Sequence, residues 1–238
     1  MTIPFAQPPK IVVFTGPGLS RESGFAPFDP ATTPPGIALE DVVTRDGFDR
    51  NPVRVFDFYN RRRRELHAAK PNLAHQGLAA LDLTRPGELL VVTRNIDDLQ
   101  ERAGSQAVIH THGELIKARC TICTRVGDWS DDLSQADECP VCGNHGHLRP
   151  HIVWVGEEPL RIDTVYIALA TCETFVSIGH AGGGELGRGF LAEATRAGAR
   201  TIEFAPEPTP ASPEFAERVY GPLVETVPNW AKEAIVGQ

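Results

Sequence analysis

Short apolar runs recur along the chain, and each of them ends in a turn of polar residues or glycine. Segments with helical spacing lie between the runs, so that strand and helix patterns alternate. This alternation predicts an α/β fold with parallel strands and right-handed crossovers. The apolar runs cover residues 11–14, 89–92, 108–109 and 175–178, and residues 201–204 predict a further strand. The helical segments cover residues 53–69, 74–81, 98–102, 165–171 and 190–197.

The first apolar run enters a glycine-rich turn and the start of a helix. The turn reads Gly16-Pro17-Gly18 and is followed by Ser20. Backbone N–H groups at such a turn can approach a phosphate closely, and the helix dipole favours its negative charge. A tight turn without a ligand explains the two glycines equally well, and Pro17 lacks one N–H group. The proline-rich residues 25–38 predict a loop, which would be a natural lid over a cofactor.

Polar residues also follow the second and third runs. Asn95 and Asp97 lie in the turn after the second run, and His112 follows the third. Open α/β sheets place their chemistry at the carboxyl ends of strands, although a histidine there is more often structural. The fourth run ends at Gly179. The strand ends at Gly16, Asn95 and Gly179 could therefore face one cleft, as a dinucleotide site requires.

Four of the five cysteines form two Cys-x-x-Cys pairs separated by fifteen residues. This spacing lets four thiolates converge tetrahedrally on one Zn²⁺ ion, and an all-cysteine site leaves no position open for water or substrate. A redox pair would be the alternative for either pair alone. The sequence therefore predicts a structural zinc site at Cys120, Cys123, Cys139 and Cys142, with Cys172 as a buried residue outside it.

The helical segment 53–69 carries four consecutive arginines at 61–64. Such a run is usually a solvated helix face. Tyr59 and Arg62, three residues apart, nevertheless share one face, where a hydroxyl and a guanidinium could bind a carboxylate. Residues 148–157 return to strand composition, and they form either an ordinary sheet strand or an edge that binds a peptide by strand addition.

Composition and charge narrow the classes of partner. The 238 residues, 41% hydrophobic and 23% charged, are ordinary for one sizeable domain with a small insert. The net charge of -8 argues against nucleic acid and anionic membranes as partners. The first ten residues lack a signal-peptide pattern, and no apolar run approaches the about 18 residues that span a membrane. These features predict a cytoplasmic protein and leave its oligomeric state open.

In this order, the motifs resemble those of the sirtuins, the NAD-dependent protein deacylases. The matching pieces are residues 15–24 for the first NAD motif, 95–97 for the second, 112–113 for the catalytic histidine, the four-cysteine module, and residues 148–150, 156–157 and 207–208. The resemblance implies a Rossmann-type large domain of residues 9–36, 72–118 and 148–238, and a small domain of residues 37–71 and 119–147 with a helical segment and a zinc ribbon.

The resemblance also implies a reaction in the cleft between the two domains. NAD would meet an acyl-lysine protein or peptide, or a small acylated amine, and the products would be nicotinamide, the free amine and O-acyl-ADP-ribose. His112 would be the general base on a ribose hydroxyl, Asn95 would position ribose or water, and Asp97 would hold the nicotinamide amide. Because neutral imidazole titrates near working pH, His112 should need no large pKa adjustment.

Two sets of contacts follow from the same resemblance. The pair Tyr59 and Arg62 is similar to the Tyr-x-x-Arg of sirtuins that prefer succinyl-, malonyl- or glutaryl-lysine, where it captures the far carboxylate of the acyl chain. The implied NAD contacts are Gly16, Gly18, Ser20, Glu22, Ser23, Arg94, Asn95, Asp97, Gly179 and His180, and the implied substrate contacts are Tyr59, Arg62, Val153, Val155 and Gly156.

The departures from the family pattern cluster at the cofactor, at Pro17, Asp29, Arg94, Gln100, His180, Ala181 and Ala205. Asp29 stands where the family has an arginine, and Arg94 where it has a glutamine. One hypothesis is that these two residues exchanged roles, so that Arg94→Gln would sharply weaken NAD binding. Three functions therefore stay open: a deacylase for acidic acyl groups, another NAD-cleaving enzyme such as an ADP-ribosyltransferase, glycohydrolase or small-molecule amide deacylase, and a binding module without catalysis.

Overall fold

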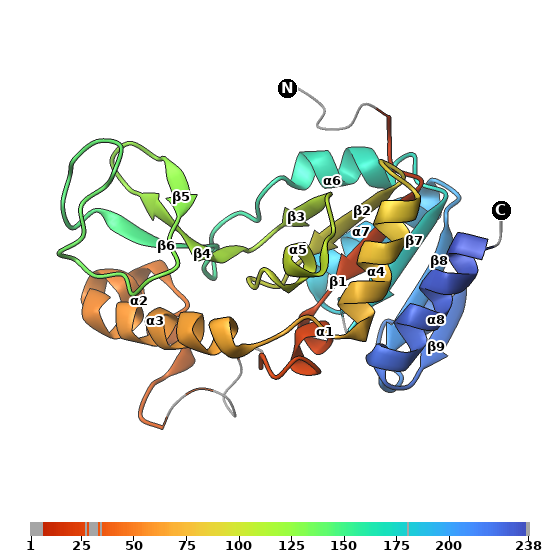
Figure 1. Ribbon diagram of the computed structural model, residues 1–238, viewed down its shortest axis with the longest axis horizontal. Coiled ribbons are helices and arrows are strands. Elements are labelled where there is room, and N and C mark those ends of the chain that lie inside the picture. The colour runs from red at the N-terminus through yellow and green to blue at the C-terminus, as the bar shows by residue number, and fades with distance from the viewer. Residues whose placement is uncertain (1–6, 27, 29–32, 34, 180, 237–238) are drawn as a thin grey trace.

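A parallel sheet of six strands forms the larger part of the molecule (Figure 1). The computed structural model describes residues 7–26, 28, 33, 35–179 and 181–236. Every neighbouring pair in this sheet is parallel, as the sequence predicted. In sheet order the strands are β3 (Val108–His110), β2 (Leu89–Thr93), β1 (Ile11–Thr15), β7 (Thr174–Ile178), β8 (Arg200–Ala205) and β9 (Glu217–Tyr220).

Helices cover both faces of this sheet, which explains why its strands are apolar on both sides. Alternate residues of β1 point to opposite faces: Val12 and Phe14 join one core cluster, and Ile11 and Val13 join the other. Phe14 packs edge-to-face on Phe190, with ring centroids 4.9 Å apart. The first core lies under α6 (Ile162–Leu169) and α7 (Gly184–Arg196), and the second under α4 (Leu73–Thr84) and α8 (Leu223–Val236).

The order of the strands reverses between β1 and β7, where two glycine turns pack against each other. A Cβ on Gly16 would lie 2.7 Å from the carbonyl oxygen of Gly179, and a Cβ on Gly18 would lie 2.9 Å from the Gly179 Cα. Gly179 itself has a φ of 70°, which favours glycine. The glycines are thus required by the turn itself, and they leave backbone groups facing the switch point, where Rossmann-type sheets bind ligands.

A smaller unit contains three antiparallel strands, β5 (Val126–Asp128), β4 (Gly113–Cys120) and β6 (Leu148–Ile152). It lies beside α2 (Arg45–Arg50) and α3 (Pro52–Ala68), away from the six-stranded sheet (Figure 1). The predicted limit at residue 118 falls within β4, and the predicted limit at 148 returns β6 to the large domain although β6 pairs with β4. The exact domain limits stay a prediction.

The C-terminal elements β9 and α8 were not predicted from the sequence. Glu22, at the end of α1 (Pro17–Arg21), accepts hydrogen bonds from the first N–H groups of α8, at 3.0 Å from Leu223 and 2.9 Å from Val224. This carboxylate therefore caps a helix some two hundred residues away in the chain. Within the described ranges, no helix has the length and apolar character needed to cross a membrane.

Candidate active site

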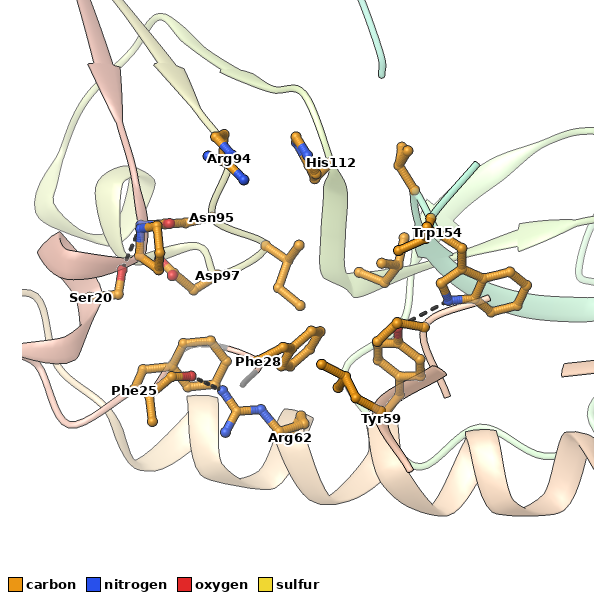
Figure 2. A pocket seen from close by; sticks show the side chains of 18 residues that line it. Ser20, Phe25, Phe28, Tyr59, Arg62, Arg94, Asn95, Asp97, His112 and Trp154 are labelled. Carbon is orange, nitrogen blue, oxygen red and sulfur yellow. Dashed lines mark hydrogen bonds between the residues drawn. The ribbon is translucent and has the colours of Figure 1, made fainter. Parts of the chain in front are cut away.

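A cavity of about 300 Å³ lies between the large sheet and the small unit (Figure 2). One end is polar and is built by the turns after β1, β2 and β3. The other end is mainly apolar. It is built by α3, by residues between 25 and 43, and by residues 152–155 at the end of β6 and after it. The cavity is lined by Pro17, Ser20, Phe25, Ala26, Phe28, Leu39, Val43, Tyr59, Arg62, Arg94, Asn95, Ile96, Asp97, His112, Ile152, Val153, Trp154 and Val155.

Asn95 and Asp97 are held rigidly at the polar end. The Asn95 side chain donates to the Ser20 hydroxyl at 2.9 Å, and its backbone N–H donates to Thr93 Oγ1, also at 2.9 Å. Asp97 accepts the backbone N–H of Leu99 at 3.2 Å. Burial raises the pKa of the Asp97 carboxyl, although a hydrogen bond from Ser20 acts in the opposite direction. Asp97 therefore offers a desolvated carboxyl oxygen to the cavity.

His112 presents a neutral imidazole to the same space. Burial, and secondarily the charge of Arg94, lower the pKa of His112 to about 4. The expectation that His112 would need no large pKa adjustment was therefore wrong, because the sequence does not show how deeply the ring lies. The Thr111 hydroxyl donates to the Thr93 carbonyl at 3.0 Å and lies 2.9 Å from His112 Nδ1. Thr111 can thus accept the Nδ1–H, which leaves Nε2 as the basic atom.

A second histidine, His110, is buried and contacts the turn that carries Asn95. Its Nδ1 lies 3.0 Å from the Asn95 carbonyl oxygen, and its Nε2 lies 2.7 Å from Glu101. Although burial is the largest influence and acts downward, the hydrogen bond and charge of Glu101 leave the pKa of His110 raised. A role was predicted for His112 and none for His110. Of the two histidines, His110 is buried and His112 lines the cavity.

Arg94 lines the cavity beside the β7–α7 turn, with Nη1 3.4 Å from the Gly183 carbonyl oxygen. Removing its charge in Arg94→Gln should raise the pKa of His112 above 4, but burial, the larger cause, should keep it below 6.5. NMR titration of the His112 ring in the ligand-free protein measures this shift. Arg61→Gln, an exposed substitution on α3, is the control. An unchanged His112 pKa in Arg94→Gln would refute the coupling.

The apolar end holds the predicted pair of α3. Tyr59 is fully buried, and its hydroxyl accepts the Trp154 indole N–H at 3.0 Å. Arg62 Nη1 lies 2.6 Å from Glu65, and Arg62 Nη2 donates to the Ala26 carbonyl. The guanidinium also lies over the Phe25 ring, 4.3 Å from its centroid. The structure thus brings Tyr59 and Arg62 to one cavity wall (Figure 2).

The interpretation of residues 61–64 as a solvated face is wrong for half of the run. Arg61 and Arg64 are exposed, whereas Arg62 and Arg63 are buried. Arg63 donates to the Leu115 carbonyl at 3.1 Å and to Asn60 at 2.7 Å. A helix turns about 100° per residue, so four consecutive positions necessarily cover both the core side and the solvent side.

These features match a known family along most of the chain. A family model described as the Sir2 family matches residues 16–183. An NAD-dependent protein deacylase of Shigella flexneri is 43% identical over 235 residues, which are 96% of this chain and 85% of that protein. The chain belongs to the Sir2 family. A second NAD-dependent protein deacylase, of Vibrio cholerae, is 41% identical and covers 100% of this chain and 97% of its own length.

Solved Sir2 structures share the fold. A Sir2 homologue in complex with NAD superposes with a TM-score of 0.83 at 28% identity, covering 94% of this chain and 88% of that one. A Sir2 protein bound to an acetylated peptide superposes with a TM-score of 0.79 at 25% identity, covering 94% of this chain and 92% of that one. The prediction of a Rossmann-type sheet with a small inserted unit is thereby confirmed.

Within this Sir2 fold, the predicted NAD contacts fall into three groups. Ser20, Arg94, Asn95 and Asp97 line the cavity, while Gly16, Gly18 and Gly179 form the packed turns beside it. Glu22 and Ser23 do not line it: Glu22 caps α8, and the Ser23 hydroxyl accepts from Asn72 at 3.0 Å. His180 and Asp29 lie outside the described residues, as does part of the predicted lid. The NAD contacts themselves stay predictions.

Three of the five predicted substrate residues of this Sir2 protein, Val153, Val155 and Gly156, lie along one segment after β6. The Val153 N–H donates to the His112 carbonyl at 2.9 Å, and the Val155 N–H donates to the Val43 carbonyl at 2.9 Å. Val155 is 71% exposed, and Gly156 has a φ of 89° without lining the cavity. This segment lies between β6 and α6 and contributes Val153, Trp154 and Val155 to the cavity wall. Its contact with a peptide stays a prediction.

The four predicted zinc ligands lie together in the small unit. Their sulfur atoms all lie within 4.8 Å of one another, with 3.7 Å between Cys120 and Cys142 and 3.8 Å between Cys123 and Cys139. Tetrahedral ligation with Zn–S bonds of about 2.3 Å requires sulfur separations of about 3.8 Å. The four thiols therefore fit one zinc ion. Cys172 is buried elsewhere, as predicted.

Proposed function

We propose that this protein is an NAD-dependent lysine deacylase that prefers acyl chains ending in a carboxylate, such as succinyl-lysine. The deacylase activity follows the family and its relatives, whose names state that activity. The acyl preference goes beyond them and rests on one observation: a buried tyrosine hydroxyl and a buried guanidinium share the wall of a cavity whose opposite end holds His112.

The polar end fits NAD. Packed glycine turns lie at the switch point beside it, Arg94 supplies a positive charge, and Asn95 and Asp97 supply an amide and a buried carboxyl. Bound NAD would supply an electrophilic ribose carbon with nicotinamide as the leaving group. Asp97 would hold the carboxamide of that group. His112 Nε2, unprotonated at neutral pH, would accept a proton from a ribose hydroxyl.

The apolar end fits an acyl chain with a terminal carboxylate. Burial raises the pKa of Tyr59, so that its hydroxyl stays a neutral donor. The buried Nε atom of Arg62 has no hydrogen-bond partner among the described residues, and an unpaired buried donor is costly. A carboxylate between these two groups would satisfy both. The charge of Arg62 would also offset the free-energy cost of removing the substrate carboxylate from water.

The pair is tested by Arg62→Met, which removes the charge and keeps the aliphatic stem. Losing a charge-assisted hydrogen bond should lower kcat/KM for a succinyl-lysine peptide by about 10- to 100-fold, while kcat/KM for the matched acetyl-lysine peptide should change little. Nicotinamide and the acyl product are followed together by mass spectrometry. Arg61→Met, on the exposed side of the same helix, is the matched control.

The same assay separates the remaining functions. Succinyl transfer to ADP-ribose that depends on Arg62 supports the proposal. Equal loss with both peptides, or a wild-type protein that prefers acetyl-lysine, would refute the acyl preference while leaving deacylation standing. Nicotinamide release without deacylation would instead indicate another NAD-cleaving activity, and absence of NAD turnover would indicate a binding module.

A further inference from the structure

Trp154 makes a hydrogen bond that decides how the Tyr59 hydroxyl is used. The Trp154 indole nitrogen lies 3.0 Å from the Tyr59 oxygen. An indole N–H can only donate, so Tyr59 must be the acceptor. The hydroxyl hydrogen of Tyr59 is then left to point elsewhere. Within the described part of the chain the Tyr59 side chain makes no other hydrogen bond, although the residue is fully buried and lines the cavity.

An ion pair between the buried Arg149 and the half-buried Glu157 holds Trp154 in place. The guanidinium of Arg149 lies over the indole, 3.5 Å from the ring centroid, and Arg149 binds Glu157 with two hydrogen bonds of 2.6 and 3.0 Å. Glu157 also accepts the backbone N–H of Trp154 at 2.9 Å. The Trp154 ring is therefore fixed from one face by Arg149 and from its own backbone by Glu157.

This arrangement explains residues that the proposed reaction does not use. Arg149 belongs to the Leu148-Arg149-Pro150 motif, and Glu157 follows Gly156, yet neither side chain lines the cavity. Both instead converge on Trp154, which does line it. The chain of contacts runs from Glu157 through Arg149 to Trp154. It ends in the hydrogen bond between Trp154 and Tyr59 (Figure 2), so the loop after β6 is tied to the apolar end of the cavity.

We propose that Trp154 is a positioning residue for acyl selection: its indole N–H occupies the acceptor side of the Tyr59 oxygen and so directs the hydroxyl hydrogen toward the carboxylate of an acidic acyl chain. This inference rests on the acyl preference proposed above. Without the indole N–H, the Tyr59 hydroxyl can rotate and lose its hydrogen to another acceptor. Trp154 would then affect binding of succinyl-lysine and leave acetyl-lysine, which lacks the carboxylate, unaffected.

The test is Trp154→Phe, which removes the N–H and keeps an aromatic ring under Arg149. For the succinyl-lysine peptide, KM should rise about fivefold to tenfold with little change in kcat, as expected for one neutral hydrogen bond. The acetyl-lysine peptide should change less than twofold. Tyr59→Phe should give the same selective loss, and the double variant should lose no more than Tyr59→Phe alone, because Trp154 acts through Tyr59.

Each other outcome contradicts the inference in a recognisable way. Equal losses with both peptides would mean that Trp154 acts only by packing, and additive losses in the double variant would mean that it acts independently of Tyr59. If the wild-type protein shows no succinyl preference, the proposed function fails first and this inference falls with it. A selective loss in Arg62→Met without one in Trp154→Phe would refute the inference alone.

A measurement on the folded wild-type protein guards against a misfolded Trp154 variant. The indole ¹H–¹⁵N signal of Trp154 should lie downfield while Tyr59 accepts its hydrogen bond, and it should move upfield in Tyr59→Phe. Adding the succinyl-lysine peptide with NAD should shift this signal, and the acetyl-lysine peptide should shift it much less. A Trp154 signal that does not respond to Tyr59→Phe would overturn the proposed bond.

Discussion

His112→Ala is expected to lower the rate of NAD-dependent deacylation by about 10²- to 10⁴-fold, the usual contribution of a positioned general base. His112 is the one cavity residue with a neutral basic nitrogen at neutral pH among those that the structure describes, because burial and Arg94 keep its pKa at about 4. The Thr111 hydroxyl lies within hydrogen-bond distance of His112 Nδ1 and can accept its hydrogen. Nε2 is therefore the basic atom that His112→Ala removes.

The measurement is single-turnover formation of deacylated peptide, with NAD binding determined separately by calorimetry. NAD affinity should change only a few-fold, because the proposed NAD contacts at Asn95, Asp97 and the glycine turns do not depend on the imidazole. His67→Ala removes an exposed histidine from α3 and should leave activity unchanged. Retention of more than about a tenth of the wild-type rate in His112→Ala would contradict the role of His112 as general base.

The core of the fold could be predicted because it is encoded locally. β1, β2 and β7 are buried on both faces, so their sequences are mostly apolar. β9 and α8 could not be recognised in the same way. β9 lies at the sheet edge and begins with Glu217 and Arg218, and α8 contains Pro228. β9 packs on β8 and α8 packs on α4. The apolar spacing of Leu223, Val227 and Ala231 in α8 is typical of a helix, but Pro228 is disfavoured in a helix interior.

Some residues of the candidate site could likewise be predicted from the local sequence, and others could not. Asn95, Asp97 and His112 could be predicted because they follow apolar strands directly, where the chain order alone places them at one edge of the sheet. Trp154 and Phe28 also line the cavity but come from segments distant in sequence. Their part in the site depends on how the small unit packs, which no local pattern reports.

The partners of charged side chains and the pKa values of buried groups could not be predicted from the sequence, because burial and residues distant in the chain determine them. The carboxylate of Glu22, a predicted NAD contact, accepts hydrogen bonds from the N-terminus of α8. A single charged residue in a turn can serve a ligand or a distant helix equally well, and only the three-dimensional structure distinguishes the two. The depressed pKa of His112 has the same origin, since both of its causes, burial and Arg94, are tertiary.

Loss of zinc is expected to unfold the small sheet and to abolish deacylation with it. The segment 121–147 has little apolar core of its own: all three residues of β5 are exposed, and the local cluster consists mainly of Phe56, Leu133, Leu148 and the cysteines. Zinc contributes about 10–16 kcal/mol to the folding of zinc-finger peptides. Removing one thiolate by Cys142→Ser should therefore cost more stability than this cluster can supply.

Unfolding of the small sheet should disturb the apolar end of the cavity through Asn60. Its side chain donates to the Leu133 carbonyl at 2.9 Å and accepts the Leu133 N–H at 2.8 Å. Asn60 lies on α3 between Tyr59 and Arg62, so disorder around Leu133 removes a support from the helix that carries the acyl pocket. The six-stranded sheet makes none of these contacts and should stay folded.

Metal analysis and hydrogen–deuterium exchange separate these two regions. The wild-type protein should hold one zinc ion per chain. Treatment with a strong chelator, or Cys142→Ser, should increase exchange in residues 121–147 and then in α3, while β1 and β2 stay protected. Cys172→Ala removes a cysteine outside the cluster and should keep the zinc.

Full zinc content and unchanged protection in Cys142→Ser would contradict a four-thiolate site. Zinc loss without loss of activity would show that Asn60 does not couple the two regions.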